Sequence, residues 1–141
     1  LAAHTRVATI ACPFTGAQVA AVPAIRPDVG IVHAQQADVH GNVQLWGIIG
    51  VQKEAVLASR VSIVTVEEIV PKLELRPGGV IIPGWAITAV APAPGGAHPS
   101  YAHGYYERDN AFYVAWDAIS RDRETFAEWM QTHVLDVGAA A

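Results

Sequence analysis

The segment Val61-Ser-Ile-Val-Thr-Val-Glu-Glu-Ile-Val70 decides the fold of this chain. Most of its residues are β-branched, and polar and apolar residues do not alternate strongly along it. A short, nearly continuous apolar run of this kind is typical of a strand covered on both faces, as in a parallel sheet flanked by helices. We therefore predict a buried strand over 61–70 that ends in two carboxylates.

These two carboxylates, Glu67 and Glu68, have two possible roles. Ligand crevices form at the carboxyl ends of strands in open α/β sheets, so the pair occupies a position at which chemistry can occur. Carboxylates at strand ends also cap helices or pair with an arginine from another element. The residue types alone leave both interpretations open.

Hydrophobic periodicity predicts the neighbouring elements. Residues 47–60 have apolar positions on one face, which indicates a helix, and the strand follows at once, as in a right-handed crossover. Asp38 and Gly41-Asn42 favour a tight turn between extended arms, because Asp binds turn backbone and Gly and Asn tolerate positive φ. Residues 17–25 fit a short helix or an irregular cover. We also predict buried strands over 6–11 and 28–34 and extended runs over 80–82 and 85–90.

The last third of the chain changes character. Residues 91–101 form a loop rich in proline and glycine, and loops of this kind carry function more often than cores do. Two helices should follow, the first capped by Asp109 or Asn110 and the second by Asp122. Their apolar residues have helical spacing and should face inward: Phe112, Trp116, Ile119, Phe126, Trp129, Met130 and Val134.

Composition sets the domain count and predicts a partner. With 141 residues, the chain fits one α/β domain over 1–141. Charged residues make up 16% and hydrophobic residues 52%, against about 25% charged in an ordinary soluble domain. A surface this poor in charge predicts a large contact with another polypeptide.

Charge and cysteine content exclude several classes of function. The net charge is −4 without a basic patch, so neither nucleic acid nor an anionic membrane is an expected partner. No apolar run reaches the roughly 18 residues that cross a bilayer. Cys12 is the only cysteine, which excludes an internal disulfide, favours a reducing compartment such as the cytoplasm, and fits a buried structural thiol.

No common catalytic motif is present. The six histidines show no metal-ligand spacing, so we expect no metal site, and there is no G-x-S-x-G elbow and no dinucleotide or phosphate-loop fingerprint. The remaining candidates are the Glu67/Glu68 pair and the loop over 95–101. Residue patterns alone therefore predict an α/β domain with an oligomer interface and no specific activity.

Four motifs in this order extend the interpretation: Ala37-Asp-Val-His-Gly-Asn42, Val66-Glu-Glu-Ile-Val70, Ile82-Pro-Gly84 and Pro94-Gly-Gly-Ala-His-Pro-Ser-Tyr101. Together they resemble the C-terminal half of the α-subunit of family I coenzyme A transferases, from Pro13 to Leu135. The first two are similar to the 3-oxoacid type, and the last, with the following Tyr105-Tyr-Glu-Arg-Asp109, is similar to the glutaconate type.

This resemblance implies an open, mainly parallel α/β sheet flanked by helices, ending in a helical pair. It also implies transfer of coenzyme A from an acyl-CoA to a carboxylate through a glutamyl-CoA intermediate, with the CoA thioester as substrate and no permanently bound cofactor. In the family the attacking glutamate belongs to a β-subunit, so the resemblance implies a hetero-oligomer in which this chain, as part of a longer α-subunit, is inactive alone.

The resemblance gives the candidate residues different roles. None of them is expected to be catalytic. Gly95, Gly96, His98, Ser100 and Tyr101 are expected to bind substrate or to line the subunit contact, with turn chemistry as the alternative. Glu67, Glu68, Asp38 and Asn42 are expected at strand ends and the interface. Two other functions stay open: a hydrolase that opens a CoA-linked ring compound, and a non-catalytic assembly domain.

Overall fold

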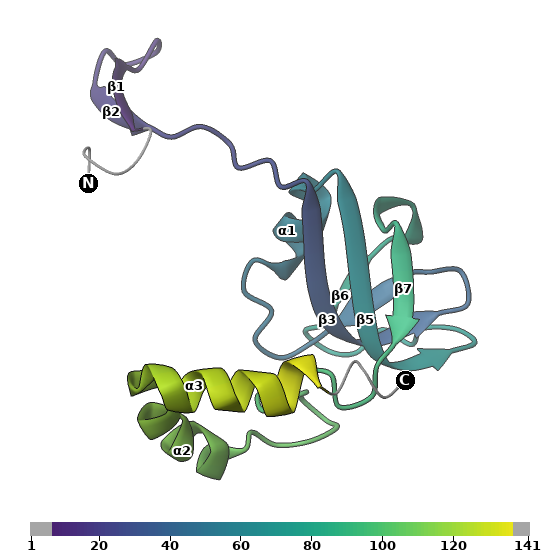
Figure 1. The fold of residues 1–141 in the computed structure, drawn as a ribbon. Helices are drawn as coiled ribbons and strands as arrows, with labels where there is room; N and C mark the ends of the chain where they lie inside the picture. Colours follow the sequence, from purple (N-terminus) through teal and green to yellow (C-terminus); the bar gives the residue numbers. More distant parts are fainter. Residues whose placement is uncertain (1–6, 137–141) are drawn as a thin grey trace.

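A computed structural model of the chain describes residues 7–136. They form a five-stranded mixed sheet, a separate two-stranded hairpin, one helix against the sheet and a C-terminal helical pair (Figure 1). The strands are β1 (Ala8–Ala11), β2 (Gln18–Ala21), β3 (Val29–Asp38), β4 (Val43–Leu45), β5 (Val61–Val70), β6 (Val80–Ile82) and β7 (Ala89–Pro92). The helices are α1 (Gln52–Ala58), the 3-10 helix η1 (Gly84–Ala86), α2 (Asn110–Arg121), α3 (Arg123–Met130) and the π-helical turn η2 (Gln131–Leu135).

The large sheet has the strand order β6-β4-β3-β5-β7. The β3–β5 and β5–β7 pairs are parallel, and the β3–β4 and β4–β6 pairs are antiparallel. The predicted α/β class, the strand over 61–70 and the C-terminal helical pair are confirmed. The sheet is mixed because the tight turn after Asp38 returns the chain as β4 beside β3 in the opposite direction.

One face of the sheet carries the hydrophobic core. Val64 and Val66 of β5 are fully buried there, and α1 contributes Val56. At the carboxyl-terminal end of α1, an added Cβ on Gly30 of β3 would lie 2.4 Å from the Ser59 hydroxyl, so glycine allows this close approach. The opposite face is open near the start of β3, where Ile31 is 73% exposed, and is covered further along, where Glu67 is buried. The prediction of a strand covered on both faces is therefore wrong for part of one face.

The N-terminal hairpin differs from its prediction. The strand expected over 6–11 is β1, which is exposed and pairs only with β2, while residue 6 lies outside the described residues. Residues 17–25 contain strand β2 and no helix. Figure 1 shows this hairpin apart from the sheet, joined to β3 by an extended segment. Cys12 lies at the hairpin turn and is half-buried, so the expected buried thiol is wrong, because no second layer formed by residues 7–136 covers the turn.

Two boundaries also differ, for backbone reasons. The helix predicted over 47–60 is confined to α1, because Gly47 and Gly50 adopt positive φ angles of 87° and 58°, which a right-handed helix does not contain. The run over 85–90 is not extended throughout. It starts inside η1 and becomes strand only at Ala89.

The C-terminal helices pack mainly against each other. Asp109 caps α2 by accepting the Phe112 N–H, and Asp122 caps α3 by accepting the Thr125 N–H. The rings of Trp116 and Trp129 meet edge to face at 4.7 Å between centroids. Helical spacing therefore identified an aromatic cluster, but no residue of either helix is buried. Phe126 faces Trp116 but stays 38% exposed, and the inward orientation is wrong for Val134, which is 47% exposed, because no further layer of described residues covers it.

Candidate functional site

The parallel register of β3 and β5 creates a polar cluster near the carboxyl ends of both strands. His33 pairs directly with Thr65, and Glu67 is two residues further along β5, on the same face. The side chain of Glu67 is only 3% exposed. β5 continues to Val70, so Glu67 and Glu68 lie inside the last four residues of the strand and not beyond its end.

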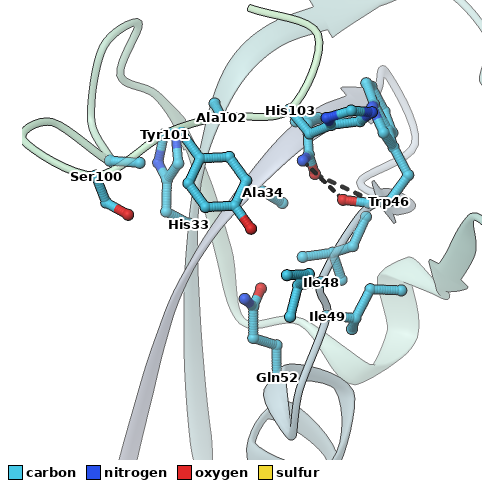
Figure 2. A pocket seen from close by; sticks show the side chains of 13 residues that line it. His33, Ala34, Trp46, Ile48, Ile49, Gln52, Ser100, Tyr101, Ala102 and His103 are labelled. Atoms are coloured by element: carbon cyan, nitrogen blue, oxygen red, sulfur yellow. Dashed lines mark hydrogen bonds between the residues drawn. The ribbon is translucent and has the colours of Figure 1, made fainter. Parts of the chain in front are cut away.

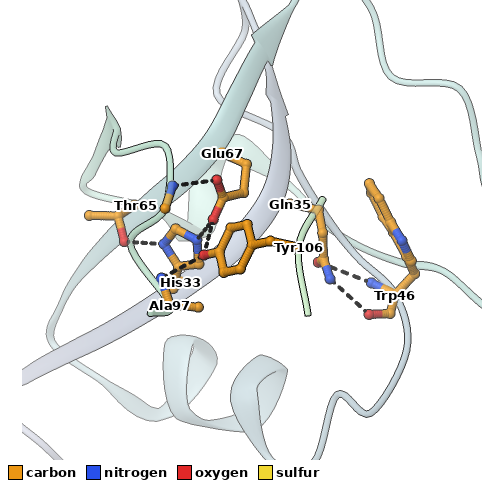
Figure 3. Close-up of polar contacts among 8 residues, drawn as sticks. His33, Gln35, Trp46, Thr65, Glu67, Ala97 and Tyr106 are labelled. Carbon is orange, nitrogen blue, oxygen red and sulfur yellow. Dashed lines mark hydrogen bonds and ion pairs between the residues drawn. The ribbon is translucent and has the colours of Figure 1, made fainter. Parts of the chain in front are cut away.

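Glu67 is the centre of this cluster, as Figure 3 shows. One carboxylate oxygen accepts a hydrogen bond from the Tyr106 hydroxyl at 2.5 Å and one from His33 Nε2 at 2.6 Å. The other oxygen accepts the backbone N–H of Gly95 at 2.7 Å. Three donors from three parts of the chain thus converge on one buried carboxylate.

These donors decide the charge of Glu67. Burial raises the pKa of the carboxyl group, but the hydrogen bonds from Tyr106, the Gly95 N–H and His33 together outweigh it and leave the pKa below its ordinary value. Burial, and then the hydrogen bond to Glu67, raise the pKa of the Tyr106 phenol. At neutral pH the pair is therefore a carboxylate with a phenol that donates to it.

His33 has no free ring nitrogen. An ionised carboxylate only accepts hydrogen bonds, so Nε2 donates its proton to Glu67. Nδ1 lies 2.9 Å from the Thr65 hydroxyl. With both nitrogens engaged inside the protein, His33 is not available as a general base, and its ring serves as part of a wall.

The loop over 95–101 is fixed to this cluster at three points. Besides the bond between Gly95 and Glu67, the Ala97 N–H donates to the Tyr106 hydroxyl oxygen at 2.9 Å. Gly96 packs on the imidazole: an added Cβ would lie 2.8 Å from His33 Cε1, so a larger residue would force the loop outward. The Glu67 cluster therefore determines where this loop lies.

The loop residues predicted to bind substrate separate into two groups. Ser100 and Tyr101 line an open cavity of about 320 Å³, together with the neighbouring Ala102 and His103 (Figure 2). His98 does not line it. Its Nε2 lies 3.5 Å from an Asp109 carboxylate oxygen, and its ring meets Phe112 edge to face. Gly95 and Gly96 are also absent from the cavity wall.

The opposite wall of this cavity comes from the sheet and from the segment that leads into the first residue of α1. Residues 33–35 of β3 and Trp46, just after β4, form one side, and Ile48, Ile49 and Gln52 form the other. The Gln35 amide is held in place because it donates to the Trp46 carbonyl at 3.0 Å and accepts the Trp46 N–H at 3.3 Å.

Asp38 and Asn42 form a separate clamp. One Asp38 oxygen accepts the N–H groups of His40 and Asn42, and the other accepts the Asn42 side-chain amide at 2.9 Å. The bond from the Asn42 side chain is the main reason that the pKa of Asp38 is lowered. Asn42 Oδ1 in turn accepts the Gly84 N–H at 2.9 Å, so the turn between β3 and β4 is tied to η1.

Glu68 has a more exposed environment on the other face of β5. Its Oε2 accepts a hydrogen bond from Gln36 Nε2 at 3.0 Å and one from the Tyr105 hydroxyl at 3.0 Å. Burial first, and then this bond to Glu68, raise the pKa of Tyr105. Glu68 therefore joins β5 to β3 and to the segment before α2.

Residue patterns missed part of this arrangement. His33 had no motif signal, and Tyr106 was noted only as part of Tyr105-Tyr-Glu-Arg-Asp109, without a role. The strand register could have placed His33, because pairing the runs over 29–38 and 61–70 puts it opposite Thr65. No pattern in the sequence indicates that Tyr106 reaches Glu67 across 39 residues.

Residues 7–136 provide neither a metal cluster nor a helix that could span a membrane. His, Cys, Asp and Glu side chains form no group of three or more that could hold a metal ion in that range. None of the helices in this part of the chain is long and apolar enough to cross a bilayer.

The fold and the cluster define an α/β domain in which a buried carboxylate braces a cavity-forming loop at the carboxyl ends of parallel strands. The sequence profile of the Coenzyme A transferase family matches residues 7–93. Over 125 residues the chain is 62% identical to a subunit of 3-oxoadipate CoA-transferase from Pseudomonas knackmussii, covering 89% of this chain and 44% of the relative. This chain therefore belongs to the coenzyme A transferase family.

Two other comparisons agree. The chain is 41% identical over 128 residues to a subunit of glutaconate CoA-transferase from Acidaminococcus fermentans, covering 89% of this chain and 40% of the relative. The crystal structure of glutaconate coenzyme A-transferase from the same organism superposes with a TM-score of 0.82 at 36% identity, over 93% of this chain and 42% of that chain. The chain spans less than half the length of these relatives.

Proposed function

We propose that residues 1–141 are one domain, the C-terminal part of a CoA-transferase α-subunit. In this proposal, a complex of the α-subunit with a β-subunit moves coenzyme A from an acyl-CoA to a carboxylate. The 62% identity to the 3-oxoadipate CoA-transferase relative carries the proposal and makes 3-oxoadipate the first carboxylate to test.

The proposed chemistry is a carboxylate exchange. A β-subunit glutamate attacks the thioester carbonyl and expels CoA as a thiolate, leaving an acyl-glutamyl anhydride. The thiolate attacks the glutamyl carbonyl and releases the acyl group as a carboxylate, giving a glutamyl-CoA thioester. The acceptor acid then attacks this thioester, and the steps run in reverse with the new acyl group.

The surroundings of Glu67 support a nucleophile from outside this chain. A nucleophilic carboxylate needs an oxygen that can approach the thioester. The Glu67 side chain is 3% exposed, and both its oxygens are hydrogen-bonded by Tyr106, His33 and Gly95. Its lowered pKa further weakens it as a nucleophile. We assign Glu67 the role of bracing the loop.

The other predicted site residues receive roles in the same proposal. Ser100 and Tyr101 face the acyl-CoA from the cavity wall, whereas Gly95 and Gly96 keep the loop against the Glu67 cluster. His98 belongs to the subunit contact. Glu68, Asp38 and Asn42 brace strand ends beside that interface.

The proposed setting follows from the same assignment. The working enzyme is a cytoplasmic hetero-oligomer with CoA thioester as substrate and no resident cofactor. Two exposed apolar residues of β3 support a further protein contact. Ile31 is 73% exposed and Val29 is 50% exposed on the same face of the sheet.

Reconstitution tests this function. The full-length protein is combined with a β-subunit, and CoA transfer from succinyl-CoA to 3-oxoadipate is followed by chromatography of the acyl-CoA products. We expect transfer only when both subunits are present. Assembly without transfer to any carboxylate would contradict the proposal and favour an assembly domain. If the assembled protein instead opened a CoA-linked ring compound by hydrolysis, the hydrolase function would be favoured over CoA transfer.

A further inference from the structure

The polar side chains of the open cavity beside His33 are of two kinds. Some have every polar atom engaged. His33 binds Thr65 and Glu67 through its two ring nitrogens, and the Gln35 amide pairs with the backbone of Trp46. These bonds hold both side chains in a fixed frame, and they use both ring nitrogens of His33.

The second kind has no hydrogen-bond partner within residues 7–136. Gln52 Oε1 is buried and unpaired, although a buried carbonyl oxygen normally accepts a hydrogen bond. The hydroxyls of Ser100 and Tyr101 also bond to no other described residue, and both residues line the same cavity. Figure 2 shows the Gln52 amide and the Tyr101 hydroxyl pointing into one space. This space therefore offers one buried acceptor and two donors.

The remaining side chains of the wall are the His103 imidazole, the Trp46 indole and aliphatic groups. No Asp, Glu, Lys or Arg is among the residues that form the wall. Leu45, Ile49 and Ala102 contribute aliphatic surface, and two of them, Leu45 and Ala102, are buried. A phosphate or a second carboxylate would find no lysine or arginine among the described residues of this wall, so a neutral chain is the ligand that matches best.

We propose that this cavity binds a neutral chain that contains secondary amides and methylene groups. If the proposed function holds, this ligand is the pantetheine arm of the acyl-CoA. Gln52 Oε1 accepts an amide N–H of the arm, and the hydroxyls of Ser100 and Tyr101 donate to an amide carbonyl. Ile49 and Leu45 contact the methylene groups between the amides.

Binding of two fragments of coenzyme A tests this assignment. The full-length protein in its assembled form is titrated calorimetrically with pantetheine, and separately with 3′-phosphoadenosine 5′-diphosphate, which lacks the arm. Gln52→Leu keeps the approximate size and removes the acceptor. We expect pantetheine affinity to fall roughly tenfold, the effect of one lost hydrogen bond, and the nucleotide affinity to stay unchanged.

Two further variants complete the design. Tyr101→Phe should weaken pantetheine several-fold without affecting folding, since the residue is 37% exposed and its hydroxyl has no partner among the described residues. Gln131→Leu makes the same chemical change as the Gln52 variant at an exposed position outside the cavity wall, and should leave both affinities unchanged.

The outcomes separate the site from the function. Unchanged pantetheine affinity in both the Gln52 and Tyr101 variants would overturn the site, even if CoA transfer is observed. Loss of pantetheine affinity in these variants would support the site, even if no transfer is found with any carboxylate. Protection of Gln52 from hydrogen exchange by a partner segment, with no response to pantetheine, would show a protein occupant and overturn the assignment.

Discussion

The carboxylate of Glu67 accepts the backbone N–H of Gly95 at 2.7 Å across 28 residues of chain. This single contact joins β5 to the start of the loop whose later residues, Ser100 and Tyr101, form one wall of the cavity. A buried carboxylate in this position acts as a mechanical link, because it is held by donors from β3, the loop and Tyr106 simultaneously.

Glu67→Gln should destabilise the protein. An amide has one accepting oxygen, so its NH₂ group must face either the Gly95 N–H or the donors Tyr106 and His33. We expect the free energy of unfolding to fall by about 2 kcal/mol, the value of a hydrogen bond to a charged group. Denaturant unfolding measures this change. Glu68→Gln is the matched control and should cost less, since Glu68 is exposed, and equal losses would contradict the account.

Tyr106→Phe should loosen the loop. The variant removes the hydroxyl that donates to Glu67 and leaves the Ala97 N–H without its acceptor. We expect a loss of about 1–2 kcal/mol in unfolding free energy and faster hydrogen exchange at the Ala97 amide. Tyr113→Phe changes a residue that is 42% exposed and should do neither. Wild-type exchange at Ala97 in the Tyr106 variant would show that the loop is held by other contacts.

Acid should release the same link. The folded-state pKa of Glu67 lies below the unfolded value, so folding favours the ionised form. Its contribution is complete above the ordinary carboxyl pKa of about 4.3 and is lost as the pH falls through the folded pKa. Asp38 has a shift in the same direction, so acid sensitivity is shared. Between roughly pH 5 and pH 2, the unfolding free energy of Glu67→Gln should fall less steeply than that of wild type. The two slopes should differ by at most the uptake of about one proton on unfolding. Parallel curves would rule out this role.

Asn42→Ala should separate the β3–β4 turn from η1. The variant removes the acceptor of the Gly84 N–H and one donor to Asp38. We expect a loss of about 1–2 kcal/mol in the free energy of unfolding. Asn110→Ala removes an exposed side chain that accepts only from Arg108 and should change little. Comparable losses in the two variants would argue against the clamp.

Much of the central sheet could be predicted from the residues. The β-branched run over 61–70 identified β5, and Asp38 with Asn42 identified the turn that returns the chain as β4. These signals are local: strand propensity and turn chemistry act within a few residues. The aromatic spacing over 112–129 found a real cluster for the same reason.

Burial and the cavity could not be predicted in this way. An alanine-rich strand such as β1 has the same composition whether or not a second layer covers it. The link between Glu67 and Tyr106 depends on where two distant segments lie, and local patterns do not encode this. Gln52 lines the cavity as the first residue of α1, which begins only after the positive φ angles of Gly47 and Gly50.

The location of the reacting carboxylate tests the central proposal most directly. The assembled protein is incubated with acyl-CoA, the products are digested, and peptide mass spectrometry finds the glutamate that carries CoA as a thioester. We predict that this glutamate lies in the partner polypeptide and that peptides covering residues 1–141 remain unmodified. A CoA adduct on Glu67 or Glu68 would contradict the account.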